Sequence, residues 1–258
     1  MNLLKVQGVG KIFGGLAAVR DLSFTIKKGV IAGLIGPNGA GKTTVLNLAS
    51  GVLTPNQGKI FLKEKDITAL KPHSVTKLGL ARTFQATTLF SARTAVENIC
   101  LGRHCRGKAG FWGTLFNTVL ARQDEKMDRQ KALELLSFMK LDSFQDVPAQ
   151  NLSHGNQRRL GVAIALAADP ELILLDEPMT GMNPAETAEM MDLILRIRDM
   201  GITVLLVEHD MKAVMGLCDR IVVINYGQKI AEGTPAEIQK NGEVIEAYLG
   251  AEYTFAHR

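Results

Sequence analysis

Cysteine and long apolar runs are scarce in this chain of 258 residues. The three cysteines, Cys100, Cys105 and Cys218, are odd in number and lack C-x-x-C spacing, which argues against a disulfide framework or a zinc site and favours a reducing compartment. The longest apolar run, over residues 160–168, is far shorter than the roughly 20 residues of a membrane-spanning helix. The first residues also lack the apolar block of a signal peptide. We therefore expect the chain to stay out of the bilayer.

A strong charge of either sign is also missing. The net charge is +4 at pH 7, and the basic residues are scattered apart from short pairs such as Arg158-Arg159. Proteins that bind nucleic acid usually carry a clustered basic stripe, so no nucleic-acid partner is expected. The hydrophobic content of 46% and the charged content of 22% are those of an ordinary globular protein. A chain of this length can bury one large core, or one core plus a small subdomain.

The most informative feature that is present is a phosphate-binding loop. Its sequence fits the pattern G-x-x-x-x-G-K-[ST], with a buried strand predicted before it over 30–35 and a helix after it over 44–49. In that context backbone N–H groups and the helix N-terminus face an anion. Lys42 can reach the β- and γ-phosphates, and the Thr43 hydroxyl can ligand Mg²⁺. We expect a nucleoside triphosphate to be bound by Gly36, Pro37, Asn38, Gly39, Ala40, Gly41, Lys42, Thr43 and Thr44.

Strand-like and helix-like patterns alternate along most of the chain. Short apolar runs bounded by turns predict strands over 3–6, 22–26, 30–35, 59–62, 80–85, 172–175, 203–207 and 220–225. A helix is predicted from Pro184 to about Met200. This alternation predicts an α/β fold with a mainly parallel sheet. Residues 94–141 have helical patterns instead, interrupted over 107–113, which indicates an inserted helical subdomain.

Two carboxylates follow the predicted strand over 172–175. Asp176, at the end of a buried strand beside the phosphate loop, is placed to hold Mg²⁺. Glu177 then projects towards the γ-phosphate, where a carboxylate can orient and deprotonate the attacking water. Two acids after an apolar run also occur at an ordinary solvated strand end. The phosphate loop upstream favours the catalytic interpretation.

Three weaker motifs gain meaning only together with the first two. Ser153 is a good N-cap for the helical run that follows, and Gly155 permits a phosphate to approach the backbone, although an ordinary capped helix has the same pattern. His209 follows the strand over 203–207 and could hydrogen-bond the γ-phosphate, although a lone histidine is more often a surface residue. Gln85 could touch Mg²⁺ or the attacking water, and taken alone is a strand-end glutamine.

These five motifs, in this order, resemble those of the ATP-binding cassette family, and the similarity covers about residues 3–249. In this resemblance Gln85 is the Q-loop glutamine and His209 the switch histidine, and Phe13 lies where an aromatic residue stacks on adenine. The resemblance implies a P-loop NTPase core of the α/β class, with an N-terminal antiparallel β subdomain and an inserted α-helical subdomain. It also implies hydrolysis of ATP to ADP and phosphate, with ATP and Mg²⁺ as ligands. The corresponding segments are the Walker A loop over 36–43, the signature over 152–157 and the Walker B strand over 172–177.

The resemblance also predicts domain boundaries and partners. A single domain is expected over 1–250, with the catalytic core over 1–85 and 151–250, the helical subdomain over 86–150 and a tail over 251–258. It implies a head-to-tail dimer with an identical or paralogous cassette, in which Ser153 and Gly155 contact the nucleotide held by the partner. Transmembrane permease subunits are expected to bind the 86–150 region, with Leu89, Phe90 and Val96 as candidate contacts, although each of these apolar residues is equally expected as a core residue. A periplasmic or extracellular substrate-binding protein is implied indirectly, and the expected location is cytoplasmic, on the inner face of the membrane.

A narrower resemblance points to the branched-chain amino acid group of this family. It is carried by residues 181–187, 207–211 and 244–250, and by the insertion around Phe111-Trp112. Cassettes for urea uptake and for lipopolysaccharide export share much of this pattern and remain alternatives. A cassette ATPase acting on nucleic acid or ribosomes is disfavoured, because there is one motif set and Lys42 and Ser153 lie only 111 residues apart (153 − 42).

Three positions depart from the family pattern. His154 and Asn156 replace the third and fifth residues of the signature, and Asn183 stands in the D-loop where aspartate is common. Ser153 and Gly155, the phosphate contacts, are kept, so we expect an altered affinity or rate rather than loss of function. Glu177 and His209 are intact, which argues against a regulatory module that binds nucleotide without turnover.

Overall fold

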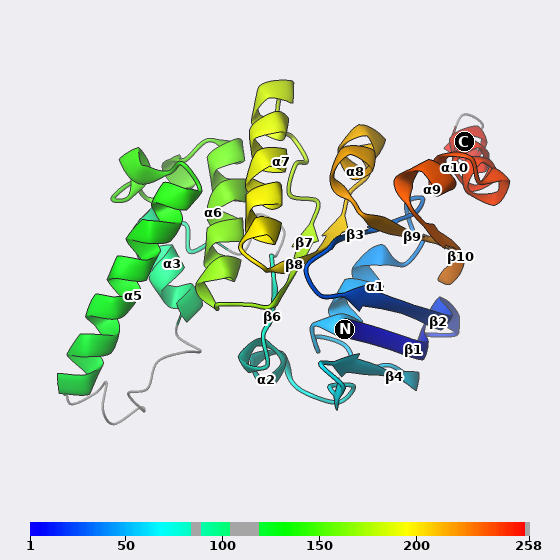
Figure 1. The fold of residues 1–258 in the computed structure, drawn as a ribbon, viewed down its shortest axis with the longest axis horizontal. Helices are drawn as coiled ribbons and strands as arrows, with labels where there is room; N and C mark the ends of the chain where they lie inside the picture. Colours follow the sequence, from blue (N-terminus) through cyan, green and yellow to red (C-terminus); the bar gives the residue numbers. More distant parts are fainter. Residues whose placement is uncertain (84–88, 104–118, 256–258) are drawn as a thin grey trace.

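The computed structural model describes residues 1–83, 89–103 and 119–255, and it contains two sheets (Figure 1). The first is antiparallel, with strand order β2-β1-β4-β5. Its strands alternate between buried and exposed side chains, so only one face is covered. The strands are β1 (Asn2–Phe13), β2 (Leu16–Lys27), β4 (Gln57–Leu62) and β5 (Lys65–Asp66).

The second sheet has six strands in the order β10-β9-β3-β8-β7-β6, and all neighbours are parallel except β10, which pairs antiparallel with β9. β3, β7 and β8 are buried along their whole length, as expected for runs of β-branched and leucine residues covered on both faces. The strands are β3 (Ile31–Ile35), β6 (Leu80–Arg82), β7 (Leu172–Asp176), β8 (Thr203–Val207), β9 (Arg220–Asn225) and β10 (Gln228–Gly233).

Helices surround the parallel sheet. α3, α5 and α6 pack against one another at one end of the molecule (Figure 1). The α-helices are α1 (Lys42–Ala49), α2 (Pro72–Lys77), α3 (Ala95–Arg103), α5 (Val119–Phe138), α6 (His154–Ala167), α7 (Pro184–Asp199), α8 (Met211–Leu217), α9 (Pro235–Gln239) and α10 (Gly242–Phe255), with 3₁₀ turns at Asp142–Phe144 and Ala149–Asn151. In the described ranges, none of these helices combines the length and apolar character needed to cross a membrane.

The parallel sheet separates two hydrophobic cores. On β3, Ile31 and Ile35 belong to the core shared with α3, α5, α6, α7 and α8, whereas Ala32 and Leu34 belong to the core shared with α1 and the antiparallel sheet. Because successive side chains of a strand point to opposite faces, one strand contributes to both cores. The carboxyl ends of the strands are thereby held rigidly from both sides.

The predicted α/β class with a mainly parallel sheet, an antiparallel β region and a helical block agrees with this architecture. The helical patterns predicted within 94–141 correspond to α3 and α5. Some element boundaries differ: the helix after the phosphate loop begins at Lys42, two residues earlier than predicted, and β1 and β2 are longer than the strands predicted over 3–6 and 22–26. The strand predicted over 80–85 is described only over Leu80–Arg82. The domain boundaries remain a prediction.

Candidate nucleotide-binding and catalytic site

The phosphate loop connects β3 to α1, and all nine predicted residues, 36–44, lie in this loop or in the first turn of the helix. Glycine is required at two positions. Gly36 has a φ of 156°, and a Cβ there would lie 2.0 Å from the Ile224 carbonyl oxygen. Gly41, the N-cap of α1, has a φ of 103°, and its Cβ would lie 2.5 Å from the Ala18 oxygen. With glycine at the N-cap, no side chain competes with a ligand for the first N–H groups of α1.

Lys42 is buried and bonds to its own loop. Its Nζ donates to the carbonyl oxygens of Gly36 at 2.7 Å and Pro37 at 3.0 Å. Burial lowers the pKa of Lys42, and the carboxylates of Glu177 and Asp176 act in the opposite direction. The ammonium group is therefore already positioned inside the loop, where the carboxylates of Asp176 at the end of β7 and Glu177 directly after it act on its pKa.

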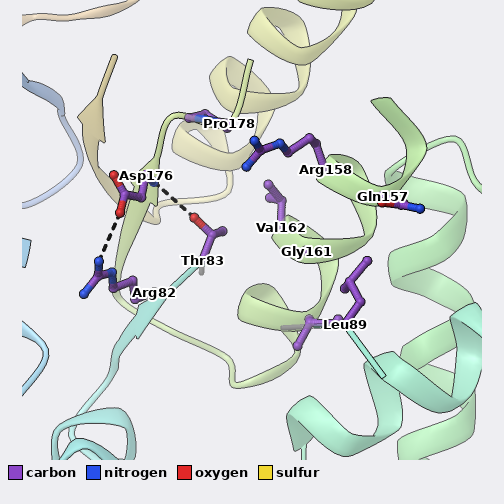
Figure 2. A pocket seen from close by; sticks show the side chains of 10 residues that line it. Arg82, Thr83, Leu89, Gln157, Arg158, Gly161, Val162, Asp176 and Pro178 are labelled. Carbon is purple, nitrogen blue, oxygen red and sulfur yellow. Dashed lines mark hydrogen bonds and ion pairs between the residues drawn. The ribbon is translucent and has the colours of Figure 1, made fainter. Parts of the chain in front are cut away.

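Asp176 ends β7 and is bonded on both its backbone and its side chain. Its N–H donates to Thr83 Oγ1 at 3.1 Å, and its Oδ2 accepts from Arg82 Nη2 at 3.0 Å (Figure 2). Arg82 Nη1 also donates to Asn47 Oδ1 of α1 at 2.6 Å. The guanidinium group thus joins the end of the Walker B strand to the helix that follows the phosphate loop.

Arg82 is a site residue that the sequence analysis missed. Its side chain is 6% exposed and that of Asp176 is 3% exposed, so the pair is buried. One feature of the sequence could have indicated it: a single arginine follows the apolar residues Leu80 and Ala81 in a predicted strand, and strands of a parallel sheet are usually covered on both faces. A cavity of about 100 Å³ lies between this pair and Gln157 of α6.

Glu177 has an unusual backbone conformation. Its φ is 50°, in the left-handed region, which costs a non-glycine residue on the order of 1–3 kcal/mol. The Glu177 N–H donates to the Val207 carbonyl oxygen at 2.9 Å, which ties this position to the end of β8. Its side chain is half-buried, and Thr180 Oγ1 lies 3.5 Å from Oε2. Such strain is typical of functional positions and persists only where neighbouring contacts enforce it.

His209 follows β8, on the same edge of the sheet as Asp176 and Glu177. Its side chain is 60% exposed, and its Nδ1 lies 3.8 Å from Oε2 of the buried Glu208. The parallel register pairs Asp176 with Val207, two residues before His209. The two strand ends that carry the predicted catalytic residues are therefore adjacent.

The signature residues lie elsewhere in the chain. Ser153 is the N-cap of α6 and accepts a hydrogen bond from the Asn156 N–H at 3.3 Å. A Cβ at Gly155 would lie 2.7 Å from Oε1 of Glu186, so glycine permits close packing of α6 against the start of α7. α6 and α1 contribute to different cores, on opposite faces of the parallel sheet (Figure 1). Within one chain, the helix that follows the signature and the helix that follows the phosphate loop are therefore separated by the parallel sheet.

The remaining predicted contacts have mixed outcomes. The Phe13 ring is 44% exposed at the end of β1, with Lys11 Nζ 5.3 Å from its centroid. Of the two interpretations given for Val96, its 2% exposure favours the core residue over the permease contact, whereas Phe90 is 58% exposed. Gln85, together with Cys105, Phe111 and Trp112, lies outside the described residues.

The chemistry of the donors suits Mg²⁺. Thr43 is exposed in the first turn of α1 and offers a hydroxyl, and Asp176 offers a carboxylate. Within the described ranges there is no group of three or more histidine, cysteine, aspartate or glutamate side chains that could hold a metal by itself. Mg²⁺ usually takes one or two protein ligands and completes its shell with water and phosphate oxygens. The two oxygen donors fit that pattern.

Comparison with known proteins agrees with this geometry. The family model described as ABC transporter matches residues 19–180, which include the phosphate loop, the signature and the Walker B strand. The chain belongs to the ABC transporter family. It is an ATPase of the ABC type, as predicted. A second model, described as branched-chain amino acid ATP-binding cassette transporter, matches residues 228–254.

Individual relatives match this ABC ATPase over nearly its whole length. It is 42% identical over 249 residues to the high-affinity branched-chain amino acid transport ATP-binding protein LivG of Salmonella typhimurium, covering 96% of this chain and 98% of LivG. Identity to BraF of Pseudomonas aeruginosa, which has the same description, is 41% with the same coverage. The solved ADP conformation of the cassette MJ1267 superposes with a TM-score of 0.85 at 32% identity, covering 97% of this chain and 99% of that one. These matches confirm the predicted fold class and family.

Proposed function

We propose that this chain is the ATP-hydrolysing subunit of a multi-chain transporter that imports branched-chain amino acids. The observation that carries the proposal is the 42% identity to LivG over 96% of the chain, which extends beyond the nucleotide site. The match of residues 228–254 to the C-terminal model of the branched-chain group is an independent support. The lipopolysaccharide-export protein LptB of Acidithiobacillus ferridurans is also similar, at 34% identity, and its function is the main competing assignment.

Binding of the nucleotide uses groups that are already in place. The backbone N–H groups of the phosphate loop, which Pro37 lacks, and the Lys42 ammonium contact the phosphates, and the partly exposed Phe13 ring stacks on the adenine. Thr43 and Asp176, with Gln85, would hold Mg²⁺. When bound, Mg²⁺ neutralises charge on the phosphate oxygens.

Hydrolysis is assigned to the residues at the ends of β7 and β8. Glu177 accepts a proton from the water that attacks the γ-phosphate in line, and His209 donates a hydrogen bond to the γ-phosphate. Ser153 and Gly155 of a second cassette complete the site from the other side of the nucleotide. Support for this arrangement is the separation of the signature from the phosphate loop within one chain.

The proposed assembly contains a second cassette, identical or paralogous, and separate permease chains. A solved dimeric cassette, MJ0796, superposes on this chain with a TM-score of 0.76 at 27% identity, covering 90% of this chain and 99% of that one. The exposed side chains of Phe90 and Leu101 support the 86–150 region as the permease-binding surface. The complex would lie on the inner face of the cell membrane and receive its cargo from a substrate-binding protein.

Uptake measurements test this function. In a strain that lacks this gene, the encoding plasmid should restore uptake of radiolabelled leucine, and a plasmid carrying Glu177→Gln should not, because the amide cannot accept the proton from water. Glu171→Gln is a matched control, since Glu171 precedes β7 and pairs with Lys28 and Lys63 on the surface, and it should restore uptake. Leucine uptake that is unaffected by loss of the gene would overturn the assignment, and altered urea uptake or lipopolysaccharide export would replace it.

A further inference from the structure

Glu208 is a buried carboxylate to which no role has been assigned. It follows β8 directly, and its side chain is 1% exposed. In the part of the chain that the structure describes, no lysine or arginine forms an ion pair with it, and the nearest basic atom is Nδ1 of the exposed His209 at 3.8 Å. Burial raises the pKa of Glu208, which means that its environment disfavours the charged form. A glutamate at this position therefore requires an explanation other than ion pairing.

The two oxygens of Glu208 bind two different loops. Oε1 accepts the Met179 N–H at 2.8 Å, in the loop that follows β7. Oε2 accepts the His209 N–H at 3.2 Å, in the loop that follows β8. A buried N–H without a partner costs about 1–3 kcal/mol, so this carboxylate compensates for its burial by satisfying two donors. An apolar residue of similar size would satisfy neither.

The first of these loops carries Glu177 in its left-handed conformation. Glu177 is held at its own N–H by the Val207 oxygen, and Met179, two residues later, is held by Glu208. Both anchors belong to the end of β8. The backbone on either side of Pro178 is thus attached to the strand that leads into His209, and the φ of 50° is kept by these contacts.

We propose that Glu208 is a positioning residue for ATP hydrolysis, whose carboxylate holds the Glu177 loop and the His209 backbone in one fixed arrangement. The inference rests on the proposed roles of Glu177 and His209, and it adds a residue that touches neither the nucleotide nor the metal. Loss of the Met179 hydrogen bond leaves the Glu177 loop attached to the end of β8 only at the Glu177 N–H, and loss of the His209 hydrogen bond frees the backbone that carries the imidazole. The water-activating carboxylate and the imidazole would then reach the γ-phosphate together less often.

The test separates turnover from nucleotide binding. Glu208→Ala removes both acceptors, and it should lower kcat by about 10- to 100-fold, as is typical when a supporting residue is lost. The KM for ATP and the affinity for a fluorescent ADP analogue should change less than about twofold, because Lys42 and the phosphate loop lie on other elements. Glu208→Gln keeps one acceptor oxygen, and it should retain a kcat between those of Glu208→Ala and the wild type.

Asp219→Asn is the matched control. Asp219 Oδ2 accepts the Ile31 N–H at 2.8 Å, at the opposite end of the strands from the nucleotide site. This variant also replaces a carboxylate that binds a backbone N–H, so it should change thermal stability without a selective loss of kcat. Glu208→Gln serves as the working variant if Glu208→Ala does not fold.

The outcomes distinguish this inference from the proposed function. If a folded Glu208→Ala protein has the kcat of the wild type, or if Asp219→Asn lowers kcat by as much as Glu208→Ala does, the proposed role of Glu208 is overturned. The proposed function is not affected by either result. If Glu177→Gln hydrolyses ATP as fast as the wild type, the proposed catalytic role of Glu177 fails, and the inference about Glu208 fails with it. A selective loss of kcat that Glu208→Gln partly restores supports the inference.

Discussion

The Arg82–Asp176 pair shows how a single residue can support the site from outside the recognised motifs. Arg82 binds Asp176 on β7 and Asn47 on α1, so the strand end that we propose binds the metal and the helix after the phosphate loop are joined through one guanidinium group. The planar group with several donors is suited to this, because lysine could not bridge two oxygen acceptors with the same fixed geometry.

Removing Arg82 should therefore be costly. Arg82→Met leaves the Asp176 carboxylate buried without its partner, which typically destabilises a protein by about 3–5 kcal/mol. Arg93→Met is the matched control, because Arg93 and Glu97 form an exposed pair with side chains 63% and 43% accessible, and such pairs contribute about 0–1 kcal/mol. Urea unfolding followed by circular dichroism measures the change in the free energy of unfolding in each of the two variants. Equal losses in the two variants would show that burial of the pair has no energetic consequence.

Residues of this kind are difficult to predict from sequence. The phosphate loop, Asp176 and Glu177 could be proposed from the sequence because residues that contact a ligand directly follow a recognisable spacing. Arg82 and Glu208 act through contacts between segments that are distant in the chain, with separations of 94 residues to Asp176 and 29 residues to Met179. Nothing in the local pattern of either residue specifies those partners.

At the scale of single elements, the start of α7 explains the unusual residue of the D-loop. Asn183 is the N-cap, and its Oδ1 accepts the N–H groups of Ala185 at 2.9 Å and Glu186 at 3.0 Å. Oε2 of Glu186 accepts the Asn183 N–H at 3.0 Å, which completes a capping box. Asparagine and aspartate are about equally good N-caps, so the departure at this position preserves the helix start.

This cap gives a prediction about stability. Asn183→Ala removes the acceptor for two N–H groups and should destabilise the protein by about 1 kcal/mol, whereas Asn183→Asp keeps it and should be within about 0.5 kcal/mol of the wild type. Guanidinium unfolding curves of the three proteins provide the comparison. If alanine were tolerated as well as aspartate, the capping box would not contribute to stability.

The strands were predicted more successfully than the helical block. β3, β7 and β8 could be predicted because each is a short apolar run bounded by polar or glycine residues. The block over 94–141 was predicted as helical patterns interrupted over 107–113, without bounds for the individual helices, and the structure describes α3 and α5 within it. Periodicity reports which face of a helix is buried, and it does not report the residues at which each helix begins and ends.

At the scale of the whole molecule, α1 after the phosphate loop and α6 after the signature belong to different cores, on opposite faces of the parallel sheet. In the proposed function, each chain therefore supplies two partial sites. A head-to-tail pair of cassettes would unite each phosphate loop with the signature of its partner, and bound ATP would contribute contacts to both.

The prediction at this scale is nucleotide-dependent dimerisation. Glu177→Gln with Mg-ATP should run as a dimer in size-exclusion chromatography with light scattering, because it binds ATP without destroying it, and with Mg-ADP it should remain monomeric. Adding Ser153→Arg, which places a bulky side chain at the expected interface, should abolish the dimer while Phe13 and the phosphate loop still bind nucleotide. If the protein keeps the mass of a monomer with ATP, a homodimer is contradicted and a paralogous partner is favoured. Mixing the protein with a paralogous cassette and ATP would then be expected to give a heterodimer.

The contacts of Lys42 with Gly36 and Pro37 have a consequence for the energetics of ligand entry. Because the ammonium group already has carbonyl acceptors inside the loop, ligand binding exchanges one set of hydrogen bonds for another and requires little ordering of the backbone. Such preorganisation predicts a small conformational entropy cost, and a binding enthalpy that reflects the difference between phosphate and carbonyl as acceptors.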